Sequence, residues 1–112
     1  MQMINHISSD EIKNNRDNYV LLDIREDYER ETDGFIPKSE HIKGSKLDIY
    51  TLTDFFKSHN GEHIVVYCHS GARAQSLIDI VNKNNIYDKS KISNLRGGIQ
   101  MWKASLYEIE YP

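Results

Sequence analysis

The sequence holds a single cysteine, Cys68, and its setting is the feature that most directly indicates chemistry. Cys68 follows the apolar, β-branched run of residues 64–67 and precedes a loop of small residues that leads into a helical pattern. Backbone N–H groups at a helix start carry partial positive charge, and a loop that curls around a sulfur adds more. Both effects favour the thiolate, which is the nucleophilic form of cysteine. We therefore interpret Cys68 as a nucleophile and expect the loop amides to face its sulfur.

The alternative interpretation of Cys68 is a small buried hydrophobe, which is common for a cysteine after an apolar strand. Gly71 and Arg73 in the following loop favour catalysis instead. A lone cysteine forms no intramolecular disulfide and no cysteine-based zinc site, so another molecule must resolve any oxidised or sulfur-loaded Cys68. The five histidines also lack metal-ligand spacing. We expect neither a metal nor an organic cofactor.

Length and composition limit the class of protein. A chain of 112 residues is expected to form one domain, spanning residues 1–112. Charged residues make up 28%, the net charge is −3 and the basic residues are spread along the chain, so no nucleic-acid partner is expected. There is no apolar run of about 18 residues, and residues 1–6 lack a signal pattern. We therefore expect a cytoplasmic protein without a membrane partner.

Strand and helix patterns alternate along the chain. Strands are predicted at residues 4–7, 19–24, 40–42, 63–67 and 91–95, and helices at 9–14, 25–31, 47–58, 72–83 and from Ile99 onward. This alternation predicts an α/β domain with a mostly parallel sheet of about five strands and helices on both faces. Ligands of such sheets bind beyond the carboxyl ends of the strands, where Asp23, Cys68 and Gly97-Gly98 would all fall.

Five segments of the chain stand out in order: residues 7–12, the strand end Leu22-Asp23-Ile24-Arg25-Glu26, residues 34–42, the loop 68–73, and residues 95–102 with their Leu-Arg-Gly-Gly start and Trp end. Taken in this order, they resemble the motifs of the rhodanese-like family of sulfurtransferases. The sequence departs from the family pattern at Phe35, where the family has His, and at Lys38-Ser39, where it has Gly-Ala. We expect these departures to change the packing beside the site more than the fold.

The resemblance implies a single rhodanese-like domain in which Cys68 takes a sulfane sulfur as a persulfide and passes it to a thiol or another nucleophile. It implies the following substrate-binding residues in the loop: His69, Ser70, Gly71, Ala72 and Arg73. It also implies supporting roles for Asp23 and Arg25. The loop from Cys68 to Arg73 has the six members typical of rhodaneses. Related arsenate reductases and tyrosine-phosphatase-like enzymes place five residues between Cys and Arg, which leaves room for a tetrahedral oxyanion.

The loop is poor in positive charge. His69 and Ser70 stand where family members that use thiosulfate often carry Lys or Arg. Arg73 is the remaining fixed cation, and it either binds an anionic donor or braces the loop against Asp23. The lack of a further cation weakens thiosulfate as the natural donor. Polysulfide, a small persulfide or a protein persulfide fits as well, with a thiol as the acceptor.

Two other functions remain open. The first is a non-catalytic persulfide carrier or regulatory domain that acts with a specific protein partner. The second is a cysteine-dependent arsenate reductase or phosphatase, which the loop length and the lack of a second cysteine disfavour.

The remaining conspicuous residues also have structural interpretations. Asp23 is interpreted as an acid that either pairs with Arg25 or orders the catalytic loop, and Arg25 as a residue that pairs with Glu29 or another local acid. The Gly97-Gly98 pair is interpreted as a turn into the last helix rather than a ligand contact.

Overall fold

The structure is a computed structural model that describes residues 4–112, so the first three residues of the N-terminal segment considered above lie outside it. Its strands form one five-stranded sheet in the order β1-β5-β4-β2-β3, and each neighbouring pair is parallel. The strands are β1 (His6–Ile7), β2 (Tyr19–Asp23), β3 (Glu40–His41), β4 (His63–Tyr67) and β5 (Ile92–Leu95). The predicted α/β class with a parallel sheet is confirmed.

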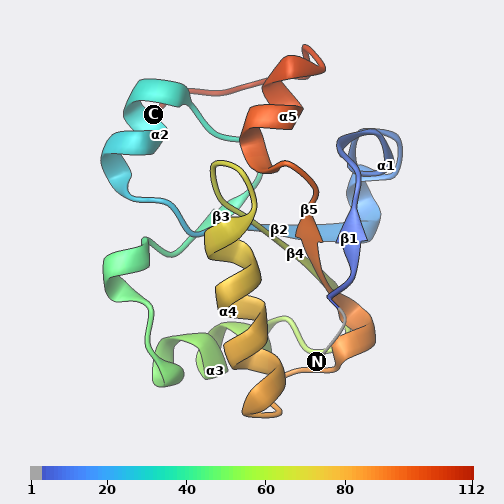
Figure 1. Ribbon diagram of the computed structural model, residues 1–112, viewed down its shortest axis with the longest axis vertical. Helices are drawn as coiled ribbons and strands as arrows, with labels where there is room; N and C mark the ends of the chain where they lie inside the picture. The colour runs from blue at the N-terminus through green and yellow to red at the C-terminus, as the bar shows by residue number, and fades with distance from the viewer. Residues whose placement is uncertain (1–3) are drawn as a thin grey trace.

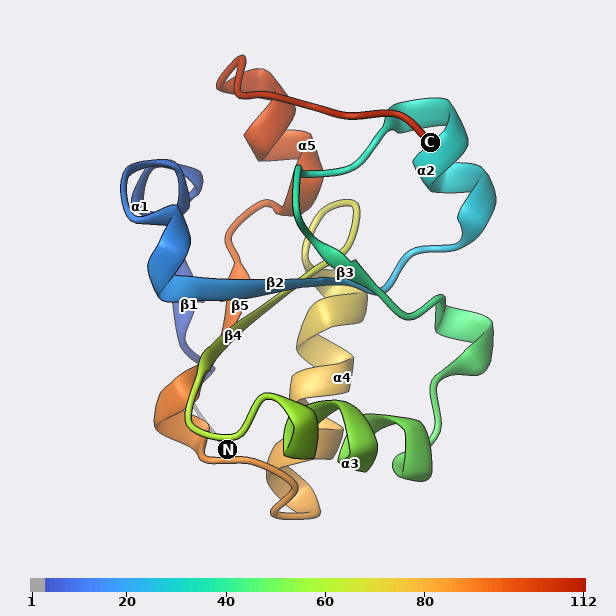
Figure 2. The same ribbon diagram turned by 180° about the vertical axis from the view of Figure 1, so that it is seen from behind.

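Helices cover both faces of this sheet. They are α1 (Ser9–Asn14), α2 (Asp27–Asp33), α3 (Ile49–Ser58), α4 (Ala72–Lys83) and α5 (Gly98–Ala104), with 3-10 turns η1 (Arg16–Asn18), η2 (Gly44–Lys46) and η3 (Lys89–Lys91). Figures 1 and 2 show α1 and α5 on one face and α3 and α4 on the other, with α2 beside the C-terminus. Among residues 4–112, none of the helices has the length and apolar character needed to cross a bilayer.

Side chains of the central strands alternate between two apolar cores. Leu22 and Val66 pack in the core under α3 and α4, whereas Leu21 and Val65 pack in the core under α1 and α5. A strand that is covered on both faces must be apolar at successive positions, which explains the continuous apolar runs in the sequence. Burying each such side chain stabilises the fold by about 1.5–3 kcal/mol. The two cores pack against opposite faces of the sheet, and the carboxyl ends of its strands carry the site described below.

Several elements begin or end at other residues than predicted, and the second helix is shifted by two residues, to Asp27–Asp33. The second helix begins at Asp27 rather than at residue 25, because the Glu26 N–H donates to the Glu29 carboxylate at 2.8 Å and so caps the helix. The strand predicted at residues 91–95 begins at Ile92, since the preceding residues form η3. The strands predicted at 4–7, 19–24 and 40–42 are also trimmed, to β1, β2 and β3. Periodicity does not locate these ends because hydrogen bonds of individual groups decide them.

Candidate active site

The predicted active-site loop lies at the carboxyl end of β4. Cys68 directly follows this strand, and Gly71, in a left-handed conformation with φ of 115°, precedes the first residue of α4. The Gly71 N–H donates to the Cys68 sulfur, with an N···Sγ distance of 3.2 Å. The buried Asn94 of β5 donates its side-chain amide to the Gly71 carbonyl at 3.0 Å. Asn94 thus ties the loop to the neighbouring strand, a contact that the sequence did not predict.

Helix α5 fixes the other side of the loop. The N–H groups of Ile99 and Gln100 donate to the carbonyls of Cys68 and His69, each at 3.0 Å. These donors belong to the first turn of the helix, whose amides have no partner within it. The C=O and N–H of a trans peptide point in opposite directions, so the amides that follow these carbonyls point away from α5. Helix α5 therefore sets the direction of the loop amides.

The Gly97-Gly98 pair has a second role beyond its turn. The left-handed φ angles of 75° and 61° confirm the turn into the last helix. A Cβ on Gly98 would lie 2.4 Å from the carbonyl oxygen of His69 and 2.5 Å from that of Cys68. The close approach of α5 to the loop thus depends on the missing side chain of Gly98. A sequence pattern shows a turn at a glycine pair but not which segment packs against it.

The sulfur of Cys68 lies beneath the loop rather than on the open surface. The residue is 1% exposed and packs in the apolar core that includes Ile24 and Leu77. The Gly71 amide is the loop N–H for which the structure records a hydrogen bond to this sulfur. The loop therefore forms a less complete cradle than the ring of amides expected from the sequence.

Arg73 pairs with Glu29, an acid on α2. Its two terminal nitrogens donate to the two carboxylate oxygens at 3.0 and 2.7 Å. The expectation that Arg73 would brace the loop against Asp23 is wrong. Arg25 pairs with a local acid as expected, and that acid is Asp23 rather than Glu29. The hydrogen bonds from Arg73 are the main reason that the pKa of Glu29 falls to about 2. The predicted loop cation is thus already neutralised by a carboxylate that is only 15% exposed.

This ion pair predicts a loss of stability in acid. Glu29 titrates near pH 2 in the folded protein and near its ordinary 4.5 when unfolded. Its contribution is therefore complete above about pH 4.5 and disappears as the pH falls toward 2. We expect about 1–2 kcal/mol, because the Arg73 side chain is half exposed and solvent weakens the pair. In urea unfolding from pH 7 to pH 2.5, Glu29→Gln should be less stable than wild type at pH 7 and should approach it in acid. Parallel curves would contradict this assignment.

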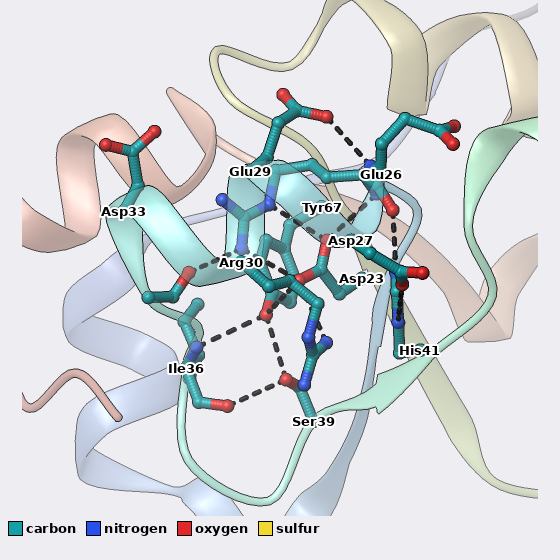
Figure 3. Close-up of polar contacts among 12 residues, drawn as sticks. Asp23, Glu26, Asp27, Glu29, Arg30, Asp33, Ile36, Ser39, His41 and Tyr67 are labelled. Atoms are coloured by element: carbon teal, nitrogen blue, oxygen red, sulfur yellow. Dashed lines mark hydrogen bonds and ion pairs between the residues drawn. The ribbon is translucent and has the colours of Figure 1, made fainter. Parts of the chain in front are cut away.

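Asp23 and Arg25 pair with each other in a buried cluster. Both side chains are fully buried, and Arg25 donates to the two carboxylate oxygens at 2.9 and 2.8 Å. Figure 3 shows Asp23 beside Arg30, which donates to the same carboxylate at 3.0 Å, and beside Tyr67. Arg25 also donates to the carbonyl of Gly34, just beyond the end of α2. The cluster therefore holds α2, and with it Glu29, against the sheet.

The predicted pairing of Asp23 with Arg25 is thus confirmed. The side chains that donate to Asp23 are those of Arg25, Arg30 and Tyr67, which lie outside the loop 68–73. Asp23 is in register with Tyr67 on the neighbouring strand, and Tyr67 packs in the core of α1 and α5. Cys68 is the next residue along the chain and packs in the core of α3 and α4. Asp23 and Cys68 are therefore separated by the sheet.

Tyr67 is a central member of this cluster that the sequence analysis missed. Its hydroxyl donates to Asp23 at 3.1 Å, accepts from the Ile36 N–H at 3.2 Å and contacts the Ser39 hydroxyl at 2.8 Å (Figure 3). Burial, with the negative charge of Asp23, raises the pKa of Tyr67 above its usual value, so the phenol stays neutral and donates. A tyrosine in an apolar strand gives no sequence signal beyond core packing.

Replacing Tyr67 by phenylalanine is expected to lower the free energy of unfolding by about 2 kcal/mol, because Asp23 loses a donor and the buried Ile36 N–H loses its acceptor. Urea denaturation measures this change. Tyr111→Phe is the matched control, since Tyr111 is 58% exposed, and it should change stability by less than about 0.5 kcal/mol. Equal effects of the two substitutions would show that the buried hydroxyl is dispensable.

The structure also bears on a metal site. Among residues 4–112, no group of three or more His, Cys, Asp or Glu side chains is placed to hold an ion.

Comparison with known proteins gives one consistent result for the fold. The sequence model of the rhodanese-like domain matches residues 8–105. A rhodanese-related protein from Thermoplasma volcanium is 24% identical with a TM-score of 0.73, over 94% of this chain and 96% of its own. A rhodanese-like domain protein from Staphylococcus aureus is 26% identical with a TM-score of 0.68, over 88% of this chain and 91% of its own.

A further structure with a similar fold carries a different function in its name. The As–Sb reductase from Leishmania major is 19% identical with a TM-score of 0.74, over 92% of this chain and 79% of its own. At this identity the likeness concerns the fold alone. A comparison of the sequence with curated proteins gave no match.

Proposed function

Because this chain belongs to the rhodanese-like domain family, we propose that it is a sulfurtransferase that carries sulfane sulfur as a persulfide on Cys68. One observation carries the proposal. Cys68 begins a six-residue loop in which the Gly71 amide donates to its sulfur. The N–H groups of Ile99 and Gln100 in α5 bind the carbonyls of Cys68 and His69, which supports an arrangement in which loop N–H groups, not these carbonyl oxygens, face a negative charge.

The transfer proceeds in two displacement steps. The Cys68 thiolate attacks the outer sulfur of the donor, a bond forms between the two sulfurs, and the bond within the donor breaks. The donor leaves with the electron pair, as sulfite from thiosulfate or as a thiolate from a persulfide. The terminal sulfur now carries the negative charge, which N–H groups of the loop stabilise. A thiolate acceptor then attacks this sulfur and regenerates the Cys68 thiolate. Charge and electrons balance without an oxidant or a metal.

The burial of the sulfur imposes a condition on this reaction. Cys68 is 1% exposed, so the loop or the apolar side chains around it must open before a donor can reach the sulfur. Elements that move in function commonly open at a lower free energy than the whole fold does.

The same burial supports the second candidate, a persulfide carrier that a specific protein partner loads after opening the loop. The partners under the two proposals therefore differ. They are a small-molecule donor and a thiol acceptor for the enzyme, and a protein persulfide for the carrier.

Intact-protein mass spectrometry tests the persulfide directly. After exposure to thiosulfate, polysulfide or cysteine persulfide, the wild-type protein should gain about one sulfur mass, and a thiol reductant should remove it. Cys68→Ala is the matched control and should gain nothing. Turnover with a small donor and a thiol acceptor supports the enzyme, whereas loading by a protein persulfide alone supports the carrier. Absence of any sulfur gain, or Cys68-dependent hydrolysis of an aryl phosphate, would overturn the sulfur-transfer proposal.

A further inference from the structure

An apolar groove of about 460 Å³ lies beside the active-site loop, between α4 and the segment that contains α3. Its volume is within the range of small-molecule sites, which are mostly apolar. Six apolar side chains line it: Ile24, Leu47, Ile49, Leu52, Leu77 and Ile80. Two of them, Ile49 and Ile80, are 43% and 45% exposed, which leaves the groove accessible from solvent.

The groove reaches the loop at Arg73, the last loop residue and itself part of the lining. Residues of its lining also belong to the apolar cluster that contains Cys68. Ile24 and Leu77 line the groove and pack in the same apolar core as Cys68. The groove and Cys68 therefore border the same apolar cluster of side chains.

The charged groups in the lining already have partners. Arg73 is neutralised by its two hydrogen bonds to Glu29. The Glu26 carboxylate accepts from the N–H and the hydroxyl of Ser45 at 2.8 and 2.9 Å. The Asp48 carboxylate caps α3 by accepting from an N–H of its first turn at 2.7 Å. Glu26 and Asp48 are bonded to neutral donors and keep their negative charge, which adds to the exclusion of a dianion. The groove thus presents apolar surface, two carboxylates and no unpaired cation to a ligand.

We propose that this groove binds the apolar body of an organic sulfane-sulfur donor, and that Glu29 disfavours an inorganic dianion by neutralising Arg73. The inference rests on the proposed sulfurtransferase function. An organic persulfide whose apolar group occupies the groove fits both the lining and the neutralised charge, whereas thiosulfate carries two charges and no apolar surface.

The chemistry with such a donor needs no further reactant. Cys68 attacks the outer sulfur of the persulfide RSS⁻, the S–S bond of the donor breaks, and RS⁻ leaves with the electron pair. Thiosulfonates RSO₂S⁻ react in the same way and release the sulfinate RSO₂⁻. They are stable probes that differ from thiosulfate in one charge and in the group R.

The test compares kcat/KM of the wild-type protein for thiosulfate, methanethiosulfonate and benzenethiosulfonate with one thiol acceptor. Burial of the phenyl ring should favour benzenethiosulfonate over methanethiosulfonate by about tenfold or more, mainly through KM. Thiosulfate should be the poorest donor of the three. A preference for thiosulfate, or equal use of the two thiosulfonates, would overturn the inference.

Two variants separate the apolar and the charge contributions. Ile80→Gln replaces an apolar side chain of the lining by a polar one at an exposed position, and it should reduce the preference for benzenethiosulfonate over methanethiosulfonate by about threefold. Leu106→Gln is its control, because Leu106 is 92% exposed and does not line the groove. Glu29→Gln should raise kcat/KM for thiosulfate by about fivefold, the effect of one partly exposed ion pair, and change benzenethiosulfonate use less.

The outcomes distinguish this inference from the function on which it rests. If Cys68 gains a sulfur but Ile80→Gln and Leu106→Gln behave alike, the groove assignment is wrong and the sulfurtransferase proposal stands. If no donor transfers a sulfur to Cys68, both fail together. If folded Glu29→Gln uses thiosulfate no better than wild type, Glu29 does not disfavour dianionic donors. A normal sulfur gain in the mass spectrum of this variant would show that its Cys68 site is intact.

Discussion

Cys68→Ser is expected to lower sulfur transfer by at least about a thousandfold, the scale of loss when a covalent nucleophile is removed. A serine hydroxyl remains protonated at neutral pH and does not form the persulfide. The measurement is the steady-state rate with an organic donor and a thiol acceptor. Retained transfer in this variant would rule out Cys68 as the nucleophile.

The fold should survive this substitution. The serine oxygen occupies nearly the same space as the sulfur and still accepts from the Gly71 N–H. A hydroxyl within the apolar core around Cys68 costs about 1 kcal/mol of stability. Cys68→Ala, which places no polar atom there, is the matched control. Equal inactivity of the two folded variants, shown by circular dichroism and urea unfolding, assigns the loss to chemistry rather than to unfolding.

Gly98→Ala is expected to produce the second large effect, a loss of activity of more than about tenfold together with about 2–4 kcal/mol of stability. Its new methyl group would lie 2.4–2.5 Å from the carbonyl oxygens of Cys68 and His69, in a left-handed conformation that alanine rarely adopts. Backbone of the loop or of α5 must therefore move. The hydrogen bonds from Ile99 and Gln100 that direct the loop would then be weakened.

Gly61→Ala is the control that isolates this clash. Gly61 has a similar left-handed φ of 87°, but a Cβ there would meet nothing within 4 Å. Its cost should be limited to about 1–2 kcal/mol of backbone strain, with activity unchanged in the folded protein. Equal losses of activity in the two variants would contradict a specific role for the contact between α5 and the loop.

The parts of the fold that were predictable are those with a strong local signal. Strands β2 and β4 are continuous apolar runs because they are buried on both faces, and such runs indicate parallel strands. Strands β1 and β3 lie within the predicted ranges 4–7 and 40–42, but they have two residues each, which is too short for periodicity to define their ends. The start of α2 depends on the reciprocal capping hydrogen bonds between Glu26 and Glu29, which the charged pattern of residues 25–31 does not reveal, so the predicted start is two residues early.

The same division applies to the site. The loop 68–73 is contiguous, so its length and composition are visible in the sequence. The contacts that hold it come from Asn94 and α5, distant segments whose proximity only the fold decides.

The partner of Arg73 illustrates the limit most clearly. Glu29 and Asp23 are both acids from the region around β2, and charge alone does not choose between them. Arg73 belongs to α4, whereas Asp23 shares its side of the sheet with Tyr67 and the opposite core. Asp23 is excluded as a partner of Arg73 because its side chain lies on the other face of the sheet. That face follows from the register of β2 with β4, which the sequence does not show.

Because Cys68 is buried, the rate at which its thiol is labelled measures how often this loop opens. The sequence offers one thiol and the folded protein exposes 1% of that residue, so a maleimide or an aromatic disulfide reagent labels it only during excursions that uncover it. The ratio between this labelling rate and that of the unfolded chain gives the equilibrium constant for uncovering. Adding a ligand of the groove during labelling would then show whether occupancy keeps the thiol covered or releases it.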